Sequence, residues 1–133
     1  MPARGHPEGQ GWLAVVLAGR ARLGECLKAA DMLEAQGVSV TVADARFAKP
    51  LDENLIRDLA HGHKTLITIE EGSRGGFGSY VLEFLAHNDL MDGLKVRTLH
   101  LPDVFQDHDS PEKQYEEAGL VASSIVAIAI KTL

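Results

Sequence analysis

The sequence predicts an α/β protein, a three-layer α/β/α sandwich whose central sheet is mostly parallel. The main observation is that short, β-branched apolar runs alternate along the chain with longer segments in which apolar residues recur at helical spacing. A second observation is that glycine or proline separates most of these segments, as expected where the chain changes direction. Four strands are clear. A fifth is expected from the N-terminal segment or from the region after Leu101, and the pattern does not decide between them.

The composition is that of one ordinary folded domain. The 133 residues are 45% apolar and 24% charged, and a domain of this size buries roughly two-thirds of its unfolded surface. The formal charge of −6 argues against nucleic acid or an anionic membrane as a partner. No apolar run approaches the roughly 20 residues that span a bilayer. Cys26 is the only cysteine, which excludes an internal disulfide and fits a cytoplasmic location.

The first residues differ from the rest of the chain. Residues 1–11 lack the apolar core of a signal peptide, and we expect a disordered arm or a linker remnant there. The folded domain is expected over residues 12–133. It begins with an apolar run, Trp12–Ala18, that predicts a first buried strand.

A helix and a second strand follow. Apolar residues at helical spacing predict a helix over about Ala21–Gln36, and Gly37 stands where a left-handed C-terminal cap belongs. Cys26 falls on the apolar face of this helix, so a packing role is favoured over a reactive thiol. Val38–Val42 alternates with period two and predicts the second strand.

The next helix begins after a proline-containing connection. Pro50 disfavours helix at the residue before it, and Asp52 is a suitable N-cap for a helix that closes at His61 and His63. Two histidines one residue apart raise the possibility of a metal site, but no third ligand has a suitable spacing. Histidine is also favoured at helix C-termini for electrostatic reasons, which is the preferred interpretation.

The central stretch of the chain combines a strand, a turn and a helix. Thr65–Ile69 predicts a third strand, and the polar, glycine-rich segment Glu70–Gly76 is expected to end it. Apolar residues at helical spacing then predict a helix to about His87. Such a turn at the carboxyl edge of a parallel sheet is where α/β folds place their sites.

The last third predicts a strand and two helices. Lys95–Leu101 is the fourth strand, and His100 within it is interpreted as a hydrogen-bonded core or edge residue. Ser110 followed by proline begins a short helix that Gly119 is expected to stop. Val121–Leu133 is expected to form a separate last helix.

Two functional hypotheses concern the glycine-rich turn. Its backbone amides at a helix start suit a phosphate group, although the turn lacks both the dinucleotide and the phosphate-loop patterns and carries Glu70 and Glu71. The favoured alternative is that the glycines permit a tight turn and close packing, while the glutamates lie at an interface or pair with Arg74. The two glutamates are not expected to act as an acid/base pair, because adjacent residues leaving a strand point in opposite directions.

A third candidate is the loop around His108. Asp107 and Asp109 flank this histidine, which makes it a candidate acid or base and the basis of a self-contained hydrolase hypothesis. A polar loop preceding a helix cap explains the same residues more simply.

Three segments, in this order and spacing, resemble the C-terminal domain of the 1-deoxy-D-xylulose-5-phosphate synthases, and more widely the C-terminal domain of the transketolase family. They are residues 43–56 (ADARFAKPLDENLI), 65–79 (TLITIEEGSRGGFGS) and 99–120 (LHLPDVFQDHDSPEKQYEEAGL). The resemblance extends over about residues 12–133. Any one of the segments alone would be a weak match, and the three together are specific.

The resemblance implies a five-stranded sheet with one antiparallel strand, used to support and assemble a homodimeric enzyme. The complete synthase condenses pyruvate with glyceraldehyde 3-phosphate, using thiamine diphosphate and magnesium, and feeds isoprenoid (non-mevalonate), thiamine and pyridoxal synthesis. Two preceding domains bind the cofactor and supply the catalytic groups, so they are the implied partners. No catalytic, cofactor-binding or metal-binding residue is carried over to this chain, which is expected to be inactive alone.

The resemblance also implies a site of contact with those domains or with a second subunit. The residues concerned are those of the glycine-rich turn: Glu70, Glu71, Arg74, Gly75, Gly76 and Gly78. The alternative hypothesis is a stand-alone binding module that uses the same helix start for a small anion or regulator.

Overall fold

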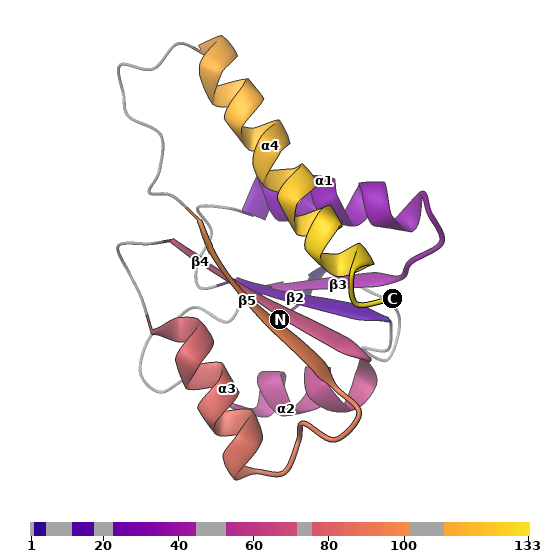
Figure 1. Ribbon diagram of the computed structural model, residues 1–133, viewed down its shortest axis with the longest axis vertical. Helices are drawn as coiled ribbons and strands as arrows, with labels where there is room; N and C mark the ends of the chain where they lie inside the picture. Colours follow the sequence, from indigo (N-terminus) through magenta and orange to yellow (C-terminus); the bar gives the residue numbers. More distant parts are fainter. Residues whose placement is uncertain (1, 5–11, 18–22, 45–52, 72–75, 102–110) are drawn as a thin grey trace.

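The predicted strands come together in one five-stranded sheet, as the computed structural model of the protein shows (Figure 1). The structure describes residues 2–4, 12–17, 23–44, 53–71, 76–101 and 111–133. The strands are β1 (Pro2–Arg4), β2 (Leu13–Leu17), β3 (Val40–Asp44), β4 (Thr65–Glu71) and β5 (Lys95–Leu101), in the order β1-β3-β2-β4-β5. All neighbours pair in parallel except β1, which is antiparallel to β3.

The fifth strand therefore comes from the N-terminal segment. The expectation of a disordered arm over residues 1–11 does not apply to Pro2–Arg4, which pair with β3. The other residues of that segment lie outside the described part of the chain. The pairing of β1 is short and its register shifts, so it forms an irregular edge to an otherwise regular sheet.

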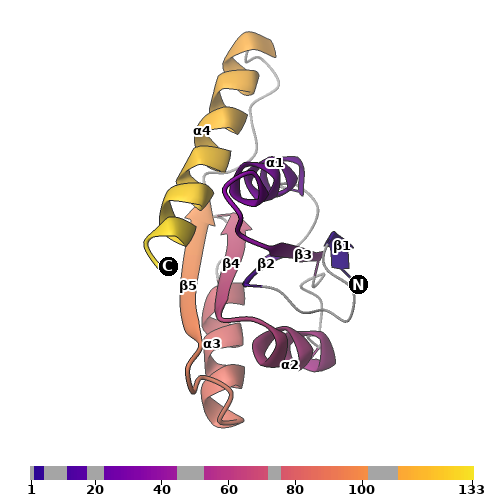
Figure 2. The same cartoon turned by 90° about the vertical axis from the view of Figure 1, so that its right-hand side faces the viewer.

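Four helices cover the two faces of the sheet. They are α1 (Leu23–Glu34), α2 (Glu53–Gly62), α3 (Phe77–His87) and α4 (Pro111–Ile130). Figure 2 shows α1 and α4 on one face and α2 and α3 on the other. The three-layer sandwich with a mostly parallel sheet and one antiparallel strand is thus confirmed.

Each face of the sheet has its own apolar core. In β2, Leu13, Val15 and Leu17 belong to the core beneath α1 and α4, whereas Ala14 and Val16 belong to the core above α2 and α3. Both sets are fully buried. A parallel strand covered on both faces needs apolar residues at every position, which is why the strand is a continuous apolar run and not an alternating one.

Most boundaries shift by one or two residues from the prediction, and two differ in a way that changes the fold. Strand β4 does not end at Ile69, because Glu70 and Glu71 continue the parallel ladder with β5, opposite His100 and Leu101. Backbone hydrogen bonds in a ladder are available to any non-proline residue, so polar side chains do not end a strand if each finds a suitable environment. The glutamates therefore extend the strand that they were expected to terminate.

The last helix is also longer than expected. Helix α4 is continuous over Pro111–Ile130, so Gly119 does not stop it. An interior glycine costs a helix only about 1 kcal/mol relative to alanine. Burial of Ala122, Ile125 and Ala129 in the core shared with α1 outweighs that cost.

The predicted cap of the first helix is confirmed. Gly37 has a φ of +86°, the left-handed conformation that glycine adopts without strain. Its amide donates to the Glu34 carbonyl oxygen, and the Val38 amide donates to the Leu33 carbonyl oxygen. This pair of hydrogen bonds is the Schellman motif, which satisfies the last carbonyl groups of the helix.

Candidate functional site

The candidate site lies at the carboxyl end of β4. The order of the parallel strands reverses between β2 and β4, because β3 and β5 lie on opposite sides of that pair. In parallel α/β sheets, ligand sites lie outside the carboxyl ends of strands at such a reversal. Glu70 stands at this end of β4, and only 3% of the residue is exposed.

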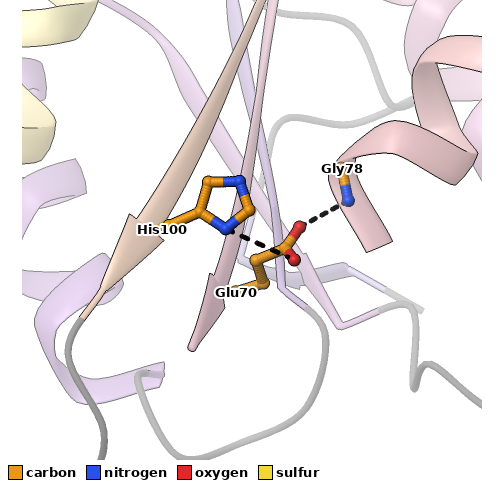
Figure 3. A network of polar contacts seen from close by, with 3 residues as sticks. All are labelled: Glu70, Gly78 and His100. Carbon is orange, nitrogen blue, oxygen red and sulfur yellow. Dashed lines mark hydrogen bonds and ion pairs between the residues drawn. The ribbon is translucent and has the colours of Figure 1, made fainter. Parts of the chain in front are cut away.

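Glu70 caps helix α3 from a distance of eight residues. One carboxylate oxygen, Oε2, accepts a hydrogen bond from the backbone N–H of Gly78, at 2.5 Å (Figure 3). The N-cap residue of α3 is Gly76, with a φ of 109° and no side-chain cap. A carboxylate is favourable there, because helix N-termini leave N–H groups without intrahelical partners and carry partial positive charge.

Gly78 is required for this contact. A Cβ atom at this position would lie 2.9 Å from Thr98 Cγ2 and 3.0 Å from both Glu70 Oε2 and Thr68 Oγ1. Contacts this short force the neighbours to move, and here they are side chains on two adjacent strands. The glycine therefore permits the close approach of α3 to the sheet that brings its amide to the carboxylate.

The second carboxylate oxygen of Glu70 is not satisfied in the same way. Oε1 is buried and has no hydrogen-bond partner among the described residues. His100 Nδ1 lies 3.5 Å from it, on the neighbouring strand β5, and the His100 side chain is 56% exposed (Figure 3). Thr68 Oγ1, buried on the same strand as Glu70, also has no hydrogen-bond partner among the described residues.

The contact between Glu70 and Gly78 bears on the hypothesis that the turn binds an anion. The Gly78 amide, one of the groups expected to bind a phosphate, already donates to a carboxylate of the protein itself. A second anion would meet both an occupied donor and the negative charge of Glu70. The structure therefore disfavours an anion-binding site at this helix start and leaves a carboxylate oxygen as the available group.

The other residues predicted for this site are only partly placed. The backbone of Glu71 belongs to β4, and Gly76 forms the N-cap of α3. Arg74 and Gly75 lie outside the described residues, as does the loop with Asp107, His108 and Asp109. The acid/base hypothesis for His108 therefore stays a prediction.

The second histidine of the pair at the end of α2 has a structural role. His63 is buried, with Nδ1 donating to the Leu59 carbonyl oxygen at 2.9 Å and Nε2 lying 2.9 Å from Thr41 Oγ1. His61 is exposed. Among the described residues, no group of three or more histidine, cysteine, aspartate or glutamate side chains could hold a metal ion.

Two further features were tested by the structure. Cys26 is buried in the core beneath α1 and α4, which confirms the packing role predicted for it. In the described part of the chain, no helix is both long enough and apolar enough to cross a membrane.

An open groove lies between α2 and α3, away from the Glu70 site. Its volume is about 210 Å³, and it is lined by Glu53, Tyr80, Glu83, Phe84, His87 and Asn88. The groove is open to solvent and none of its residues was predicted to be functional. It adds no donor or acceptor to the surroundings of Glu70.

Sequence reasoning did not identify the neighbours of Glu70 on the adjacent strand β5. Thr98 and His100 lie opposite Thr68 and Glu70 in the β4–β5 register, so the four residues form one polar patch on the face that α3 covers. His100 was predicted to be a core or edge residue, and its contact with Glu70 depends on which strands are neighbours. The strand register is the only signal that would have found this patch.

Comparison with known proteins gives a consistent family assignment. Residues 10–125 match the family described as transketolase, C-terminal domain. A solved structure described as a split gene transketolase, inactive β4 tetramer, is similar to this chain with a TM-score of 0.69 and 31% sequence identity. The similarity covers 96% of this chain and 43% of that one, so this chain spans less than half the length of that relative.

Proposed function

Since the chain belongs to the transketolase C-terminal domain family, we propose that it is the supporting and assembly domain of a thiamine-diphosphate-dependent transferase. The observation that carries this proposal is the extent of the match. The family match runs over residues 10–125, and the similarity to the split transketolase covers nearly all of this chain but less than half of the relative. In this proposal, the chain supplies one domain of a larger enzyme.

For the complete enzyme, we propose 1-deoxy-D-xylulose-5-phosphate synthase. The support is the resemblance of residues 43–56, 65–79 and 99–120 to that synthase. In this proposal, the remaining part of the enzyme binds thiamine diphosphate and magnesium and joins pyruvate to glyceraldehyde 3-phosphate. This chain contributes no group to the cofactor and is inactive alone.

The similar structure also bears on assembly. That relative is described as an inactive β4 tetramer of a split-gene enzyme. By analogy, we propose that this chain also associates with other subunits and needs them for activity. The contact with the cofactor-binding part lies at the carboxyl end of β4, around Glu70, Gly76 and Gly78.

A mixing experiment tests the proposal. This chain is added to a 1-deoxy-D-xylulose-5-phosphate synthase truncated before its third domain, and product formation and co-sedimentation are followed. The expected result is activity from the mixture and from neither piece alone. If the pieces neither co-sediment nor regain activity, even when joined by a covalent linker, the assembly function is wrong.

A further inference from the structure

Glu70 is a buried charge that the fold of this chain uses only in part. The carboxylate has two oxygens, and the structure employs one of them, Oε2, to cap α3. The other, Oε1, is buried without a hydrogen bond in the described structure. Buried polar atoms are nearly always paired, and a carboxylate taken out of water without full pairing is costly. Such an atom calls for an explanation.

A neutral side chain of the same shape would keep the hydrogen bond that Glu70 makes to α3. Glutamine at position 70 would still offer a carbonyl oxygen to the Gly78 N–H. Its amide nitrogen would stand where Oε1 now lies, 3.5 Å from His100 Nδ1, and an amide N–H can donate to an imidazole nitrogen. The hydrogen bonds of this chain therefore do not require a negative charge at this position.

We propose that Glu70 Oε1 accepts hydrogen bonds from a cationic side chain, arginine or lysine, on the part of the enzyme that completes the active assembly. This inference rests on the proposed function, since it names the partner chemistry at the contact described above. A carboxylate with one oxygen held by an amide and one without a donor among the described residues is complementary to a guanidinium or ammonium group. The positive charge also supplies the compensation that a buried carboxylate lacks.

The position of Glu70 Oε1 defines the side from which the partner's cationic group reaches it. Oε1 is itself covered, and the imidazole of His100 lies against it from the edge strand β5 (Figure 3). Because the His100 side chain is 56% exposed, the ring can turn toward solvent without disturbing either core. The partner's N–H group then takes the place of Nδ1 beside Oε1. The partner's cationic group thus approaches from the surface at edge strand β5 and binds the buried carboxylate of Glu70.

A small-molecule probe tests the acceptor in the chain on its own. N-methylguanidinium is titrated into the chain while the Gly78 amide and the His100 ring are followed by NMR, with tetramethylammonium, which has no N–H donor, as the control cation. We expect saturable shifts with N-methylguanidinium in the wild type and in Glu83→Gln, and none in Glu70→Gln. Glu83 is an exposed carboxylate on α3, so its variant makes the same chemical change away from the site.

Several results of the titration would overturn the inference. No saturable shift in the wild type, equal shifts with tetramethylammonium, or unchanged shifts in Glu70→Gln would each do so. Zn²⁺ is titrated in parallel: tight Zn²⁺ binding that His100→Ala abolishes would assign the site to a metal ion and also contradict the proposal.

The assembly itself provides the second test. With the truncated synthase, Glu70→Gln is expected to weaken association on the order of 30-fold or more, as for other buried charge pairs that lose one partner, while Glu83→Gln leaves it unchanged. The midpoint of thermal unfolding of Glu70→Gln should stay within about 4 °C of the wild type, so that a loss of association is not a loss of folding. Equal association of wild type and Glu70→Gln overturns the inference and leaves the proposed function standing. If the wild type itself does not associate, the proposed function fails and the probe titration alone decides the inference.

Discussion

The two faces of the sheet bury different kinds of side chain. On the face beneath α1 and α4, the buried strand residues are apolar, from Leu13 and Val15 in β2 to Ile67 and Ile69 in β4, except Thr65 at the start of β4, whose hydroxyl donates to that of Thr132. On the face that α2 and α3 cover, apolar residues share the sheet with the buried polar residues Thr41, Thr68 and Glu70. The same strands thus pair a face whose buried strand residues are apolar except for one hydrogen-bonded threonine with a face that carries several buried polar groups.

The polar face itself divides into two parts. Toward α2, His63 Nε2 forms a hydrogen bond with the Thr41 hydroxyl, and His63 Nδ1 donates to the Leu59 carbonyl oxygen. Toward β5, Thr68 Oγ1 and Glu70 Oε1 have no hydrogen-bond partner among the described residues. Fully paired polar groups stabilise a unique fold, whereas incompletely paired groups cost stability and point to a function beyond folding. The comparison favours the β4–β5 end as the candidate functional region.

The largest expected effect concerns the apolar face. Ile69 is next to Glu70 in β4 but lies on the opposite face, in the core beneath α1 and α4. Ile69→Ala removes fully buried methyl and methylene groups and should lower the free energy of unfolding by about 2–5 kcal/mol. Urea denaturation followed by circular dichroism measures this. If Ile69→Ala lowers the free energy of unfolding no more than Glu70→Gln does, the two faces do not differ in the way described.

The next effect concerns the contact between α3 and the sheet. Gly78→Ala would place a methyl group against Thr98, Glu70 and Thr68, and should destabilise the chain by about 1–3 kcal/mol, the usual cost of overpacking. It should also weaken association with the truncated synthase, because the displaced carboxylate no longer presents Oε1 at the same place.

Gly24→Ala is the matched control for that variant. Gly24 lies in helix α1, where an added Cβ meets nothing within 4 Å. Alanine there should raise the free energy of unfolding by about 0.5–1 kcal/mol through helix propensity. Equal effects of the two glycine substitutions would show that the close packing at Gly78 has no energetic importance.

The smallest effects separate the paired and unpaired threonines. Thr41→Val removes a hydroxyl that lies 2.9 Å from His63 Nε2 and should cost about 1–2 kcal/mol. Thr68→Val removes a buried hydroxyl without a partner in the described structure, so it should be neutral or stabilising by up to about 1 kcal/mol. Parallel thermal and urea unfolding of both variants provides the comparison. A destabilising Thr68→Val would mean that its hydroxyl is already satisfied in this chain.

Much of the fold could be predicted because local patterns specify it. Short apolar runs gave β2 to β5, helical spacing gave the helices, and Gly37 marked the end of α1. The expected end of β4 at Ile69 and the expected stop at Gly119 were wrong, because each relied on the average behaviour of a residue type. In both places tertiary packing supplied more free energy than local preference removed.

The candidate site was predictable only as a segment. The glycine-rich turn after Ile69 was recognised, together with Glu70 and Gly78, from its composition and from the family resemblance. The sequence did not reveal that Glu70 would remain in the strand, turn toward α3 and accept the Gly78 amide. That depends on the closeness of a helix to a sheet, which is a property of packing.

By itself, the amino-acid sequence determined the class of fold, the segments that become strands and helices, and the resemblance that points to the family. These follow from hydrophobic periodicity and turn chemistry, which act between residues close in the chain. Only the tertiary structure decided that β1 joins β3, that His100 stands beside Glu70, and that one carboxylate oxygen is used while the other is not. These are contacts between residues far apart in the chain, and they depend on the order and register of strands, which local preferences do not encode.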